Sequence, residues 1–216
     1  MTSPQTVARR GRLPAVRHEC TPGRAMVACE EDRRSILFCD IRGYSALAEA
    51  TPPQRLAALV GRQVGGMAEV VVAHGGEVAT LTGDGLMAVF AGSGQETNAL
   101  ACALAMQDTL ARPDGIAAGI GVATGPVATM AVHWAGRWEL SVVGDVVNVA
   151  QRLESQAGPG EVLATEACIA GAAGVLAEPA GRRLLRGRNE AVEVYRVTRA
   201  GSWHHCPEGG DATALR

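Results

Sequence analysis

Residues 77–90 read EVATLTGDGLMAVF, and this stretch decides the fold that we expect. Two runs of β-forming residues flank Gly83-Asp84-Gly85. Asp-Gly between two such runs is a strong signal for a tight hairpin, because glycine accepts the positive φ that these turns require. The stretch therefore predicts two antiparallel strands with Asp84 in the turn that joins them.

A strand and a helix are expected before this hairpin, and a helix and a strand after it. Residues 35–40 (SILFCD) are a short apolar run that fits a buried strand. Apolar residues then recur every three or four positions from residue 51 to residue 74, between a Pro-Pro start and a Gly-Gly stop, which predicts a helix. A second helix is expected over 96–111 and a strand over 116–124. This order of elements is the split βαβ, ferredoxin-like pattern of an α+β domain.

A C-terminal βαβ extension completes the predicted domain. The further expected elements are strands over 127–134 and 138–143, a helix over 145–155, a strand over 162–164, a short helix from residue 166 and a final strand over 191–197. We assign residues 32–199 to one domain. Residues 1–31 and 200–216 are interpreted as flexible tails, because they are rich in polar residues, Gly and Pro and lack an apolar period.

The composition excludes several classes of protein. Of 216 residues, 47% are apolar, which is enough to build a core. The net charge of −2 and the 3% of aromatic residues argue against a nucleic-acid surface. No unbroken run of eighteen apolar residues exists, so we expect no membrane span. The six cysteines contain no C-x-x-C pair, which indicates reduced thiols and a cytoplasmic location. All twenty basic residues are arginine.

Two carboxylates are expected to meet at one edge of the sheet. In a split βαβ unit the first two strands run parallel with the third antiparallel between them, so the end of the first strand lies beside the hairpin turn. Asp40 ends the first strand and Asp84 lies in the turn. Paired carboxylates suit Mg²⁺ or Mn²⁺, and the loop after Asp40 offers backbone N–H groups to an anion. Together they suggest a nucleoside triphosphate site; taken singly, each Asp is as well explained as a helix cap or a turn residue.

A second group of polar residues lies in residues 144–154 (GDVVNVAQRLE). Asn148 and Arg152 are four apart and therefore share one face of the predicted helix. An amide and a guanidinium aimed together suit a sugar hydroxyl and a phosphoryl oxygen. A solvated polar helix face is the alternative interpretation of the same pattern.

Several blocks of the sequence, in order, resemble the catalytic domain of class III adenylate and guanylate cyclases. The resemblance runs from about residue 34 to residue 197, and its blocks are FCDIRGYSAL (38–47), TGDGLMAVF (82–90), GIGVATGPV (119–127), VVGDVVNVAQRLE (142–154) and GPGEVL (158–163). Several linked motifs in the family order are far more specific than any one of them. The resemblance implies that residues 32–199 are a class III nucleotide cyclase domain.

The resemblance also implies roles for individual residues. Two divalent cations, Mg²⁺ or Mn²⁺, are expected on Asp40, Asp84 and the carbonyl of Ile41. Asn148 matches the residue that orients the ribose, and Arg152 matches the arginine that stabilises the transition state. The residues that match the triphosphate-binding positions of the family are Gly43, Tyr44, Ser45 and, in place of a lysine, Arg188 rather than Arg186.

The implied enzyme is a phosphorus–oxygen lyase of the adenylate cyclase type. It converts a nucleoside triphosphate, with ATP as the first expectation, to a 3′,5′-cyclic nucleotide and pyrophosphate by a two-metal mechanism. In this family the metal residues and the Asn/Arg pair of one site come from different subunits. Because this chain carries both, a head-to-tail homodimer with two equivalent sites is implied.

The base-recognition positions depart from both patterns of the family. Thr80 stands where adenylate cyclases usually carry lysine, and Ser141 stands where they carry Asp or Thr; guanylate cyclases usually place Glu and Cys at these positions. Hydroxyl groups both donate and accept, so the pair suits adenine or guanine edges alike. The alternatives are a cyclase with GTP or pyrimidine preference, or a catalytically silent dimer that binds nucleotide or a partner. A regulatory protein partner is left open.

Overall fold

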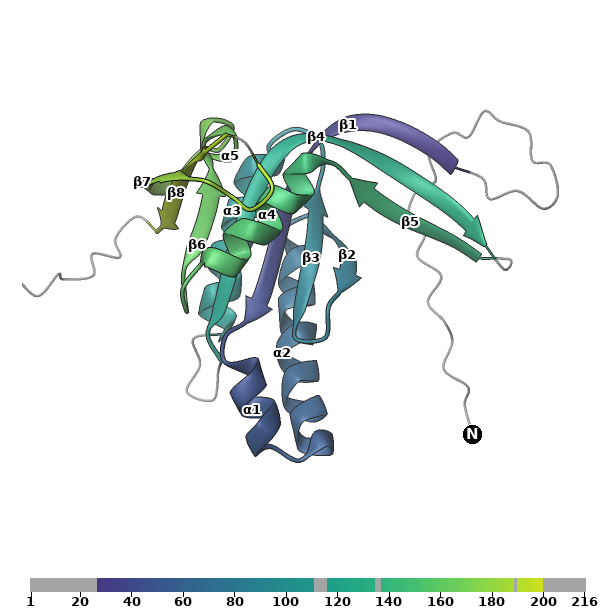
Figure 1. The fold of residues 1–216 in the computed structure, drawn as a ribbon, viewed down its shortest axis with the longest axis vertical. Helices are drawn as coiled ribbons and strands as arrows, with labels where there is room; N and C mark the ends of the chain where they lie inside the picture. Colours follow the sequence, from purple (N-terminus) through teal and green to yellow (C-terminus); the bar gives the residue numbers. More distant parts are fainter. Residues whose placement is uncertain (1–26, 111–115, 135–136, 189, 200–216) are drawn as a thin grey trace, which may run out of the picture.

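The computed structural model describes residues 27–110, 116–134, 137–188 and 190–199, and this part of the chain is built on one mixed sheet (Figure 1). Its strand order is β2-β3-β1-β4-β6-β8-β7, with β5 paired to β4. The strands are β1 (Val27–Ile41), β2 (Glu77–Leu81), β3 (Gly85–Phe90), β4 (Ala118–Trp134), β5 (Arg137–Val143), β6 (Val162–Thr165), β7 (Leu176–Arg183) and β8 (Val192–Thr198).

The first four strands confirm the ferredoxin-like prediction. They lie in the order β2-β3-β1-β4, and β3 is antiparallel to both β1 and β2, so β1 and β2 run parallel. The helices between them also fall close to the predicted ranges. They are α1 (Tyr44–Ala50), α2 (Pro53–Ala73) and α3 (Gln95–Leu110), followed after β5 by α4 (Asp145–Gln156) and after β6 by α5 (Glu166–Ala170).

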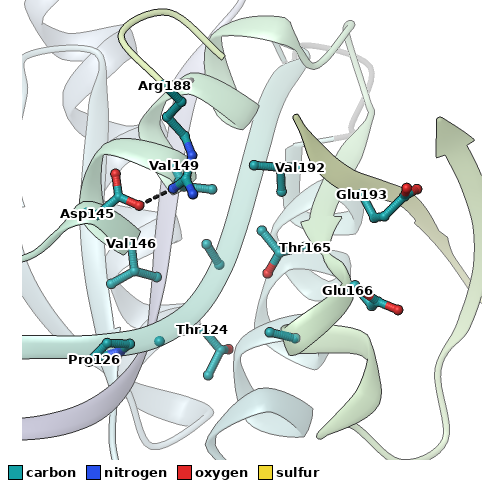
Figure 2. A pocket seen from close by; sticks show the side chains of 13 residues that line it. Thr124, Pro126, Asp145, Val146, Val149, Thr165, Glu166, Arg188, Val192 and Glu193 are labelled. Carbon is teal, nitrogen blue, oxygen red and sulfur yellow. Dashed lines mark hydrogen bonds and ion pairs between the residues drawn. The ribbon is translucent and has the colours of Figure 1, made fainter. Parts of the chain in front are cut away.

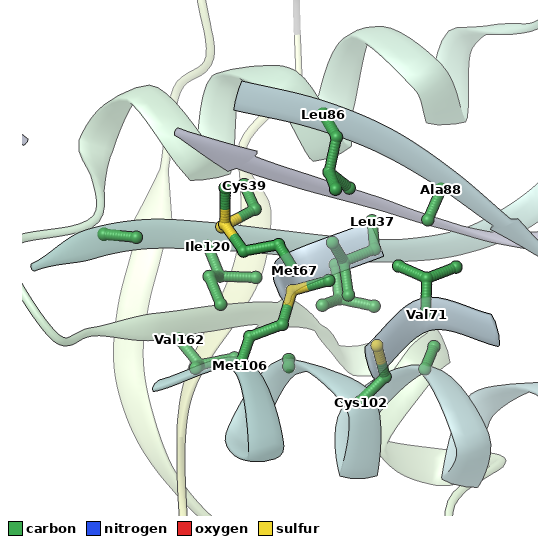
Figure 3. Packing of buried hydrophobic residues seen from close by; sticks show 14 of the residues in the cluster. Leu37, Cys39, Met67, Val71, Leu86, Ala88, Cys102, Met106, Ile120 and Val162 are labelled. Carbon is green, nitrogen blue, oxygen red and sulfur yellow. The ribbon is translucent and has the colours of Figure 1, made fainter. Parts of the chain in front are cut away.

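Helices cover both faces of the sheet, because residues along β1 alternate in direction. Leu37 and Cys39 join the core beneath α2 and α3, where Met67 and Met106 meet them (Figure 3). Ile36, on the opposite face, joins a second core beneath α4. The apolar run SILFC is therefore buried from both sides, which explains why it lacks the polar alternation of a one-sided strand.

Two strands are longer than the sequence pattern indicates. β1 begins at Val27, so residues 27–31, which we assigned to the tail, belong to the sheet. These residues include charged side chains with no apolar period, and they are held in the strand by pairing with β4, from Val27 opposite Val132 onward. β4 likewise runs unbroken through Gly125 and Pro126, where we expected a gap between two strands. Backbone pairing, which leaves no signal in side-chain periodicity, decides both cases.

The C-terminal extension contains a strand that the sequence analysis missed. β7 follows α5 and pairs antiparallel with β8, so the extension is β6-α5-β7-β8 rather than a simple βαβ unit. Its sequence, LAEPAGRR, carries Pro179 and Gly181 at a register shift. Because β7 is at the edge of the sheet, it tolerates a proline that a central strand would exclude.

Among the described residues, α2 is the one helix long and apolar enough by composition to cross a membrane. We expected no span because no apolar run is unbroken, and Arg62 and Glu69 do interrupt α2. The structure packs its residues Val64 and Met67 into the core against the sheet. A helix that covers a sheet meets the same criteria of length and composition as a span.

Candidate active site

The end of β1 and the β2–β3 turn lie side by side, as the split βαβ pattern predicts. Asp40 is directly opposite Gly85 in the β1–β3 register, and the Ile41 amide donates to the Asp84 carbonyl over 3.4 Å. Gly83 adopts a φ of 85° in the turn, which favours glycine. This geometry is consistent with the prediction that Asp40 and Asp84 meet at one edge of the sheet. We call the pair Asp40 and Asp84 at this edge the aspartate rim.

Gly85, on the other side of Asp84, is required for a different reason: the close approach of the turn to β1. A Cβ at this position would overlap the carbonyl oxygen of Cys39 and would come within 2.7 Å of the Asp40 Oδ1. The turn therefore approaches β1 more closely than any side chain allows. This contact brings the backbone of the hairpin directly against the carboxylate that ends β1.

The environment of Asp40 suits a cation. Burial, followed by the charges of Asp84 and Glu154, raises the pKa of Asp40 to about 6, while Arg42 opposes that rise. The Asp84 side chain adds a further, smaller contribution to the rise in the pKa of Asp40. Carboxylates crowded in this way repel each other when ionised, and a divalent cation removes the repulsion.

The donor set fits a divalent cation of the magnesium type. The described residues contain no group of three or more His, Cys, Asp or Glu side chains placed to hold a metal. Magnesium ions are typically bound through one or two carboxylates, with substrate phosphates and water completing the shell. Asp40 and Asp84, with the main-chain carbonyl of Ile41, match this pattern of a site that the substrate completes.

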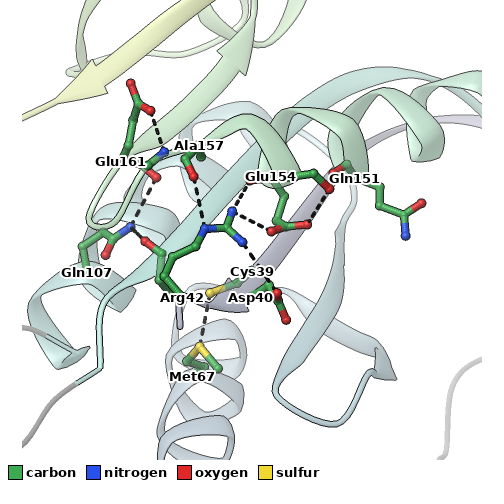
Figure 4. A network of polar contacts seen from close by, with 12 residues as sticks. Cys39, Asp40, Arg42, Met67, Gln107, Gln151, Glu154, Ala157 and Glu161 are labelled. Atoms are coloured by element: carbon green, nitrogen blue, oxygen red, sulfur yellow. Dashed lines mark hydrogen bonds and ion pairs between the residues drawn. The ribbon is translucent and has the colours of Figure 1, made fainter. Parts of the chain in front are cut away.

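Arg42 is a site residue that the sequence analysis did not single out (Figure 4). Its Nη1 lies 3.6 Å from Asp40 Oδ2, and its Nη2 lies 2.7 Å from Glu154 Oε1, although this second pair is not aligned as a hydrogen bond. Its Nε donates to the Ala157 carbonyl over 3.1 Å, and Nη2 also contacts the Glu154 carbonyl. The available signal was a permanent cation two positions after a predicted metal ligand.

In the loop after Asp40, some residues are exposed to solvent and one packs against the core. Gly43 adopts a φ of 77° at the start of α1 and is exposed, as is Ser45. Tyr44 is half-buried and packs against the core beneath α2 and α3. Gly43 and Ser45 therefore present free surface to a ligand, while Tyr44 also anchors α1; the triphosphate role of all three stays a prediction.

Asn148 and Arg152 lie on α4, as predicted. The buried stripe of α4 includes Val146, Val149 and Leu153, whereas Asn148 is exposed and Arg152 half-buried. The loop after β7 crosses this face, since a Cβ at Gly187 would lie 3.3 Å from the Arg152 guanidinium. In the described part of the chain, no hydrogen bond or ion pair joins Asn148 or Arg152 to the aspartate rim.

Arg188 is engaged within its own chain (Figure 2). It forms an ion pair with Asp145, the first residue of α4, and its Nε is buried without a hydrogen-bond partner. The side chain borders a cavity of about 340 Å³ between α4 and β8, lined also by Val146, Val149 and Thr165. Arg186 is exposed. A phosphate role for Arg188 requires exchange of Asp145 for the ligand, and this role stays a prediction.

The two base-recognition candidates lie on β2 and β5, which do not pair with each other in the sheet. Thr80 is exposed on β2, next to a register shift, and Ser141 is half-buried on β5. β2 and β5 approach each other across the end of the sheet. The approach of the two strands does not by itself join Thr80 to Ser141, and the base-recognition role of both residues stays a prediction.

Fold and site together define a class of protein: a ferredoxin-like α+β domain with a carboxylate rim that suits divalent cations and a separate Asn/Arg helix face. The family model of the adenylate and guanylate cyclase catalytic domain matches residues 26–198. The chain therefore belongs to this family.

Curated relatives and solved structures agree with this assignment. An adenylate cyclase of Anabaena cylindrica is 31% identical over 192 residues, which are 79% of this chain and 38% of the relative. An adenylate cyclase of Mycobacterium tuberculosis (strain H37Rv) is 35% identical over 153 residues, which are 65% of this chain and 34% of the relative. This chain thus spans little more than a third of the length of these relatives.

Two solved cyclases illustrate the likeness of fold. The guanylyl cyclase Cya2 matches with a TM-score of 0.73 and 25% identity, covering 81% of this chain and 96% of that one. The adenylyl cyclase CyaB of P. aeruginosa matches with a TM-score of 0.73 and 21% identity, covering 80% and 97%. At these identities, proteins named for adenylyl and for guanylyl cyclase activity match equally well, so the fold does not distinguish the base.

Proposed function

We propose that this domain is a nucleotide cyclase that converts ATP to 3′,5′-cyclic AMP and pyrophosphate in a homodimer. The observation that carries the proposal is that the β2–β3 turn brings Asp84 against the end of β1, where Asp40 lies opposite Gly85 and the Ile41 amide donates to the Asp84 carbonyl. Burial, and after it the charge of Asp84, raises the pKa of Asp40 to about 6. Membership of the cyclase family supplies the reaction class, a phosphorus–oxygen lyase. The curated relatives named as adenylate cyclases favour ATP as the substrate.

In the proposed reaction, the ribose 3′ oxygen attacks the α-phosphorus in line and pyrophosphate leaves. Asp40, Asp84 and the Ile41 carbonyl hold the divalent cations, which when bound lower the pKa of the 3′ hydroxyl and neutralise phosphate charge. Gly43 and Ser45 offer the exposed loop that receives the triphosphate. The protein's part at this rim is to fix the carboxylates before the substrate arrives.

The other half of the reaction falls to α4. Asn148 donates and accepts hydrogen bonds through its amide and orients the ribose. Arg152 places a permanent positive charge where negative charge develops on the phosphoryl oxygens. Both side chains share one face of α4, and the loop at Gly187 passes close to the half-buried Arg152.

The proposal includes a homodimer because the two halves of the proposed active site, the aspartates of the rim and the Asn148/Arg152 pair, are separate within one chain. Asn148 is exposed, and no polar contact in the described residues links it or Arg152 to Asp40 and Asp84. A second copy that packs head to tail supplies the missing half to each site and creates two equivalent sites. The half-buried Ser141 and exposed Thr80 are proposed to contact the base without strong discrimination, so GTP is the second substrate to test.

We place the domain in the cytoplasm. Cys39, Cys102 and Cys168 are free and buried, and burial raises the pKa of Cys102 and Cys168 to about 12. These thiols stay protonated and unpaired, which suits a reducing compartment.

Complementation between inactive chains tests the proposed function. Asp40→Ala and Arg152→Ala homodimers are each expected to be inactive with Mn²⁺ and ATP, whereas their mixture regains about a quarter of the wild-type activity, since half of the dimers are mixed and each has one intact site. Persistent inactivity of well-mixed dimers would contradict shared sites. Assays with each of the four ribonucleoside triphosphates identify the base, and absence of any cyclic product with nucleotide still bound would identify a silent binding dimer.

A further inference from the structure

Arg42 lies between two groups that the proposed reaction uses for different purposes. On one side its Nη1 is 3.6 Å from Asp40 Oδ2, at the metal rim. On the other side it reaches the last turn of α4, where Nη2 is 2.7 Å from Glu154 Oε1. Figure 4 shows the guanidinium spanning the space between β1 and α4. One side chain thus contacts both the carboxylate and the helix.

The contacts with α4 are those of a helix C-terminal cap. Arg42 Nε donates to the Ala157 carbonyl over 3.1 Å, and Nη2 donates to the Glu154 carbonyl. The last carbonyls of a helix lack intrahelical partners, and a cation there is favoured by the helix dipole. Arg42 and Glu154 are largely buried, with side-chain exposures of 22% and 9%, so the contacts are only weakly screened by solvent.

β4 is shaped to receive this arginine. A Cβ at Gly119 would overlap the Arg42 guanidinium, so the side chain lies directly on the strand where a glycine makes room. The Arg42 amide donates to the Ala117 carbonyl over 2.8 Å, which fixes its backbone. A Cβ at Gly121 would overlap the Ala150 carbonyl oxygen of α4, so the helix also lies directly on β4. The arginine therefore has one well-defined position.

We propose that Arg42 is a positioning residue that serves both active sites of the dimer. It orients Asp40 at the site of its own rim, and it fixes the end of α4, whose Asn148 and Arg152 complete the other site. This inference rests on the proposed function, because it requires the halves of each site to come from different chains. Lysine cannot replace Arg42, since an ammonium lacks the planar set of donors that reaches the helix carbonyls and both carboxylates together.

Mixed dimers separate the two roles. A chain with Asp40→Ala supplies only its α4, and a chain with Arg152→Ala supplies only its metal rim, so their mixture contains one working site. Arg42→Ala is then added to one chain at a time. In the Asp40→Ala chain it is expected to lower kcat about tenfold while the Mn²⁺ concentration for half-maximal activity stays unchanged, because a small displacement of a transition-state group is costly.

In the Arg152→Ala chain, the same substitution is expected to raise the Mn²⁺ concentration for half-maximal activity about fivefold, since Asp40 loses its orienting partner. Arg183→Ala is the matched control in both chains. Arg183 also contacts the end of α4, because it donates to the Gln156 side chain over 3.2 Å, but among the described residues it forms no hydrogen bond or ion pair with Asp40. The control is expected to leave both quantities within twofold of their values in the parent mixture.

A readout other than activity is amide hydrogen exchange. The Ala157 amide donates to the carbonyls of Leu153 and Glu154 in the last turn of α4. In the Arg42→Ala homodimer without metal, exchange at residues 155–157 is expected to be about tenfold faster than in the wild type and in Arg183→Ala. If the Arg42→Ala chain does not fold, Arg42→Lys replaces it in the same experiments. Its kcat, its Mn²⁺ concentration for half-maximal activity and its amide exchange are expected to change in the same direction.

The outcomes distinguish the two proposals. If the parent mixture of Asp40→Ala and Arg152→Ala chains has no activity, the proposed function fails. If that mixture is active but Arg42→Ala acts only in the chain that supplies the rim, Arg42 serves one site and the inference is overturned. Equal effects of Arg42→Ala and Arg183→Ala, in kinetics and in exchange, would also overturn it.

Discussion

The rim at Asp40 and the outer face of α4 differ in their surroundings: Asp40 has charged neighbours from its own chain, whereas the α4 face at Asn148 is open to solvent. Burial, followed by the charges of Asp84 and Glu154, raises the pKa of Asp40, and Arg42 opposes that rise. Asn148, in contrast, is exposed on α4. Under the proposed function, the groups that hold the cations are assembled within one chain, whereas the groups that meet the substrate from a second chain are left on an open surface.

Removal of a carboxylate from the rim is expected to have the largest effect. Asp84→Ala is expected to lower cyclase turnover by roughly 10³-fold or more, because cation binding contributes several kcal/mol to the transition state. The folded dimer is expected to persist, as Asp84 is in a surface turn. Cyclic nucleotide production with Mn²⁺ and the elution volume of the dimer check both statements, and an active Asp84→Ala protein would contradict the metal assignment.

On the exposed face of α4, substitution of Arg152 is expected to cause a smaller loss of turnover than substitution of Asp84. Arg152→Ala is expected to lower kcat by about 10²–10³-fold while the KM for ATP changes little, because the guanidinium acts chiefly on charge that develops in the transition state. Arg186→Ala, in an exposed residue of the neighbouring loop, is the matched comparison and separates Arg152 from general loss of positive charge. A rise in KM alone would assign Arg152 to ground-state binding instead.

Two glycines of β4, Gly119 and Gly121, make room for different parts of the site. A side chain at Gly119 would overlap the guanidinium end of the Arg42 side chain, whereas a side chain at Gly121 would overlap the α4 backbone at Ala150 and Glu154. Gly121→Ala is therefore expected to lower the free energy of unfolding by about 1–3 kcal/mol. Gly119→Ala is expected to cost less stability but to reduce activity about tenfold, as Arg42→Ala does. Denaturant unfolding and steady-state kinetics of both variants measure the difference.

The smallest expected effect is a dependence on pH. The pKa of Asp40 is about 6 in the folded protein and 3.8 for the unperturbed group, so the folded state binds the proton more tightly. The resulting stabilisation is present below pH 3.8 and is lost as the pH rises through about 6. Asp40→Asn is expected to remove this component from the metal-free unfolding curve. Unfolding across this range, compared with wild type, measures it.

Mn²⁺ has the opposite dependence, because it competes with the proton for Asp40. Its affinity is expected to weaken by about tenfold for each pH unit below 6. Calorimetric titration of the protein with Mn²⁺ between pH 5 and 7 measures this slope, and an affinity independent of pH would show that Asp40 does not bind the ion.

Much of the rim was predictable because it follows from topology. Once Gly83-Asp84-Gly85 is identified as a hairpin turn in a split βαβ unit, Asp84 must lie beside the end of the first strand. Helical spacing predicted that Asn148 and Arg152 share one face of a helix, whereas their proposed roles came from the resemblance to the cyclase family. These inferences use short-range patterns, which sequence displays directly.

Arg42 was not predictable in the same way. Its role depends on Glu154 and Ala157, more than a hundred residues away, and on the space that Gly119 leaves in β4. The start of β1 and the presence of β7 were missed for a related reason. Both depend on backbone pairing with distant strands, and β7 contains a proline that the edge position permits.

The pairing of β1 with β4 runs from Val27 to Ile41 without a missing partner. Figure 1 shows that β1 bends along its length, so its first residues form an arm beside β4 while Asp40 lies near its other end. Because a strand rises about 3.3 Å per residue, most of the strand separates Val27 from Asp40. A fluorescent label attached near Val27 is therefore expected to leave the surroundings of Asp40 unchanged.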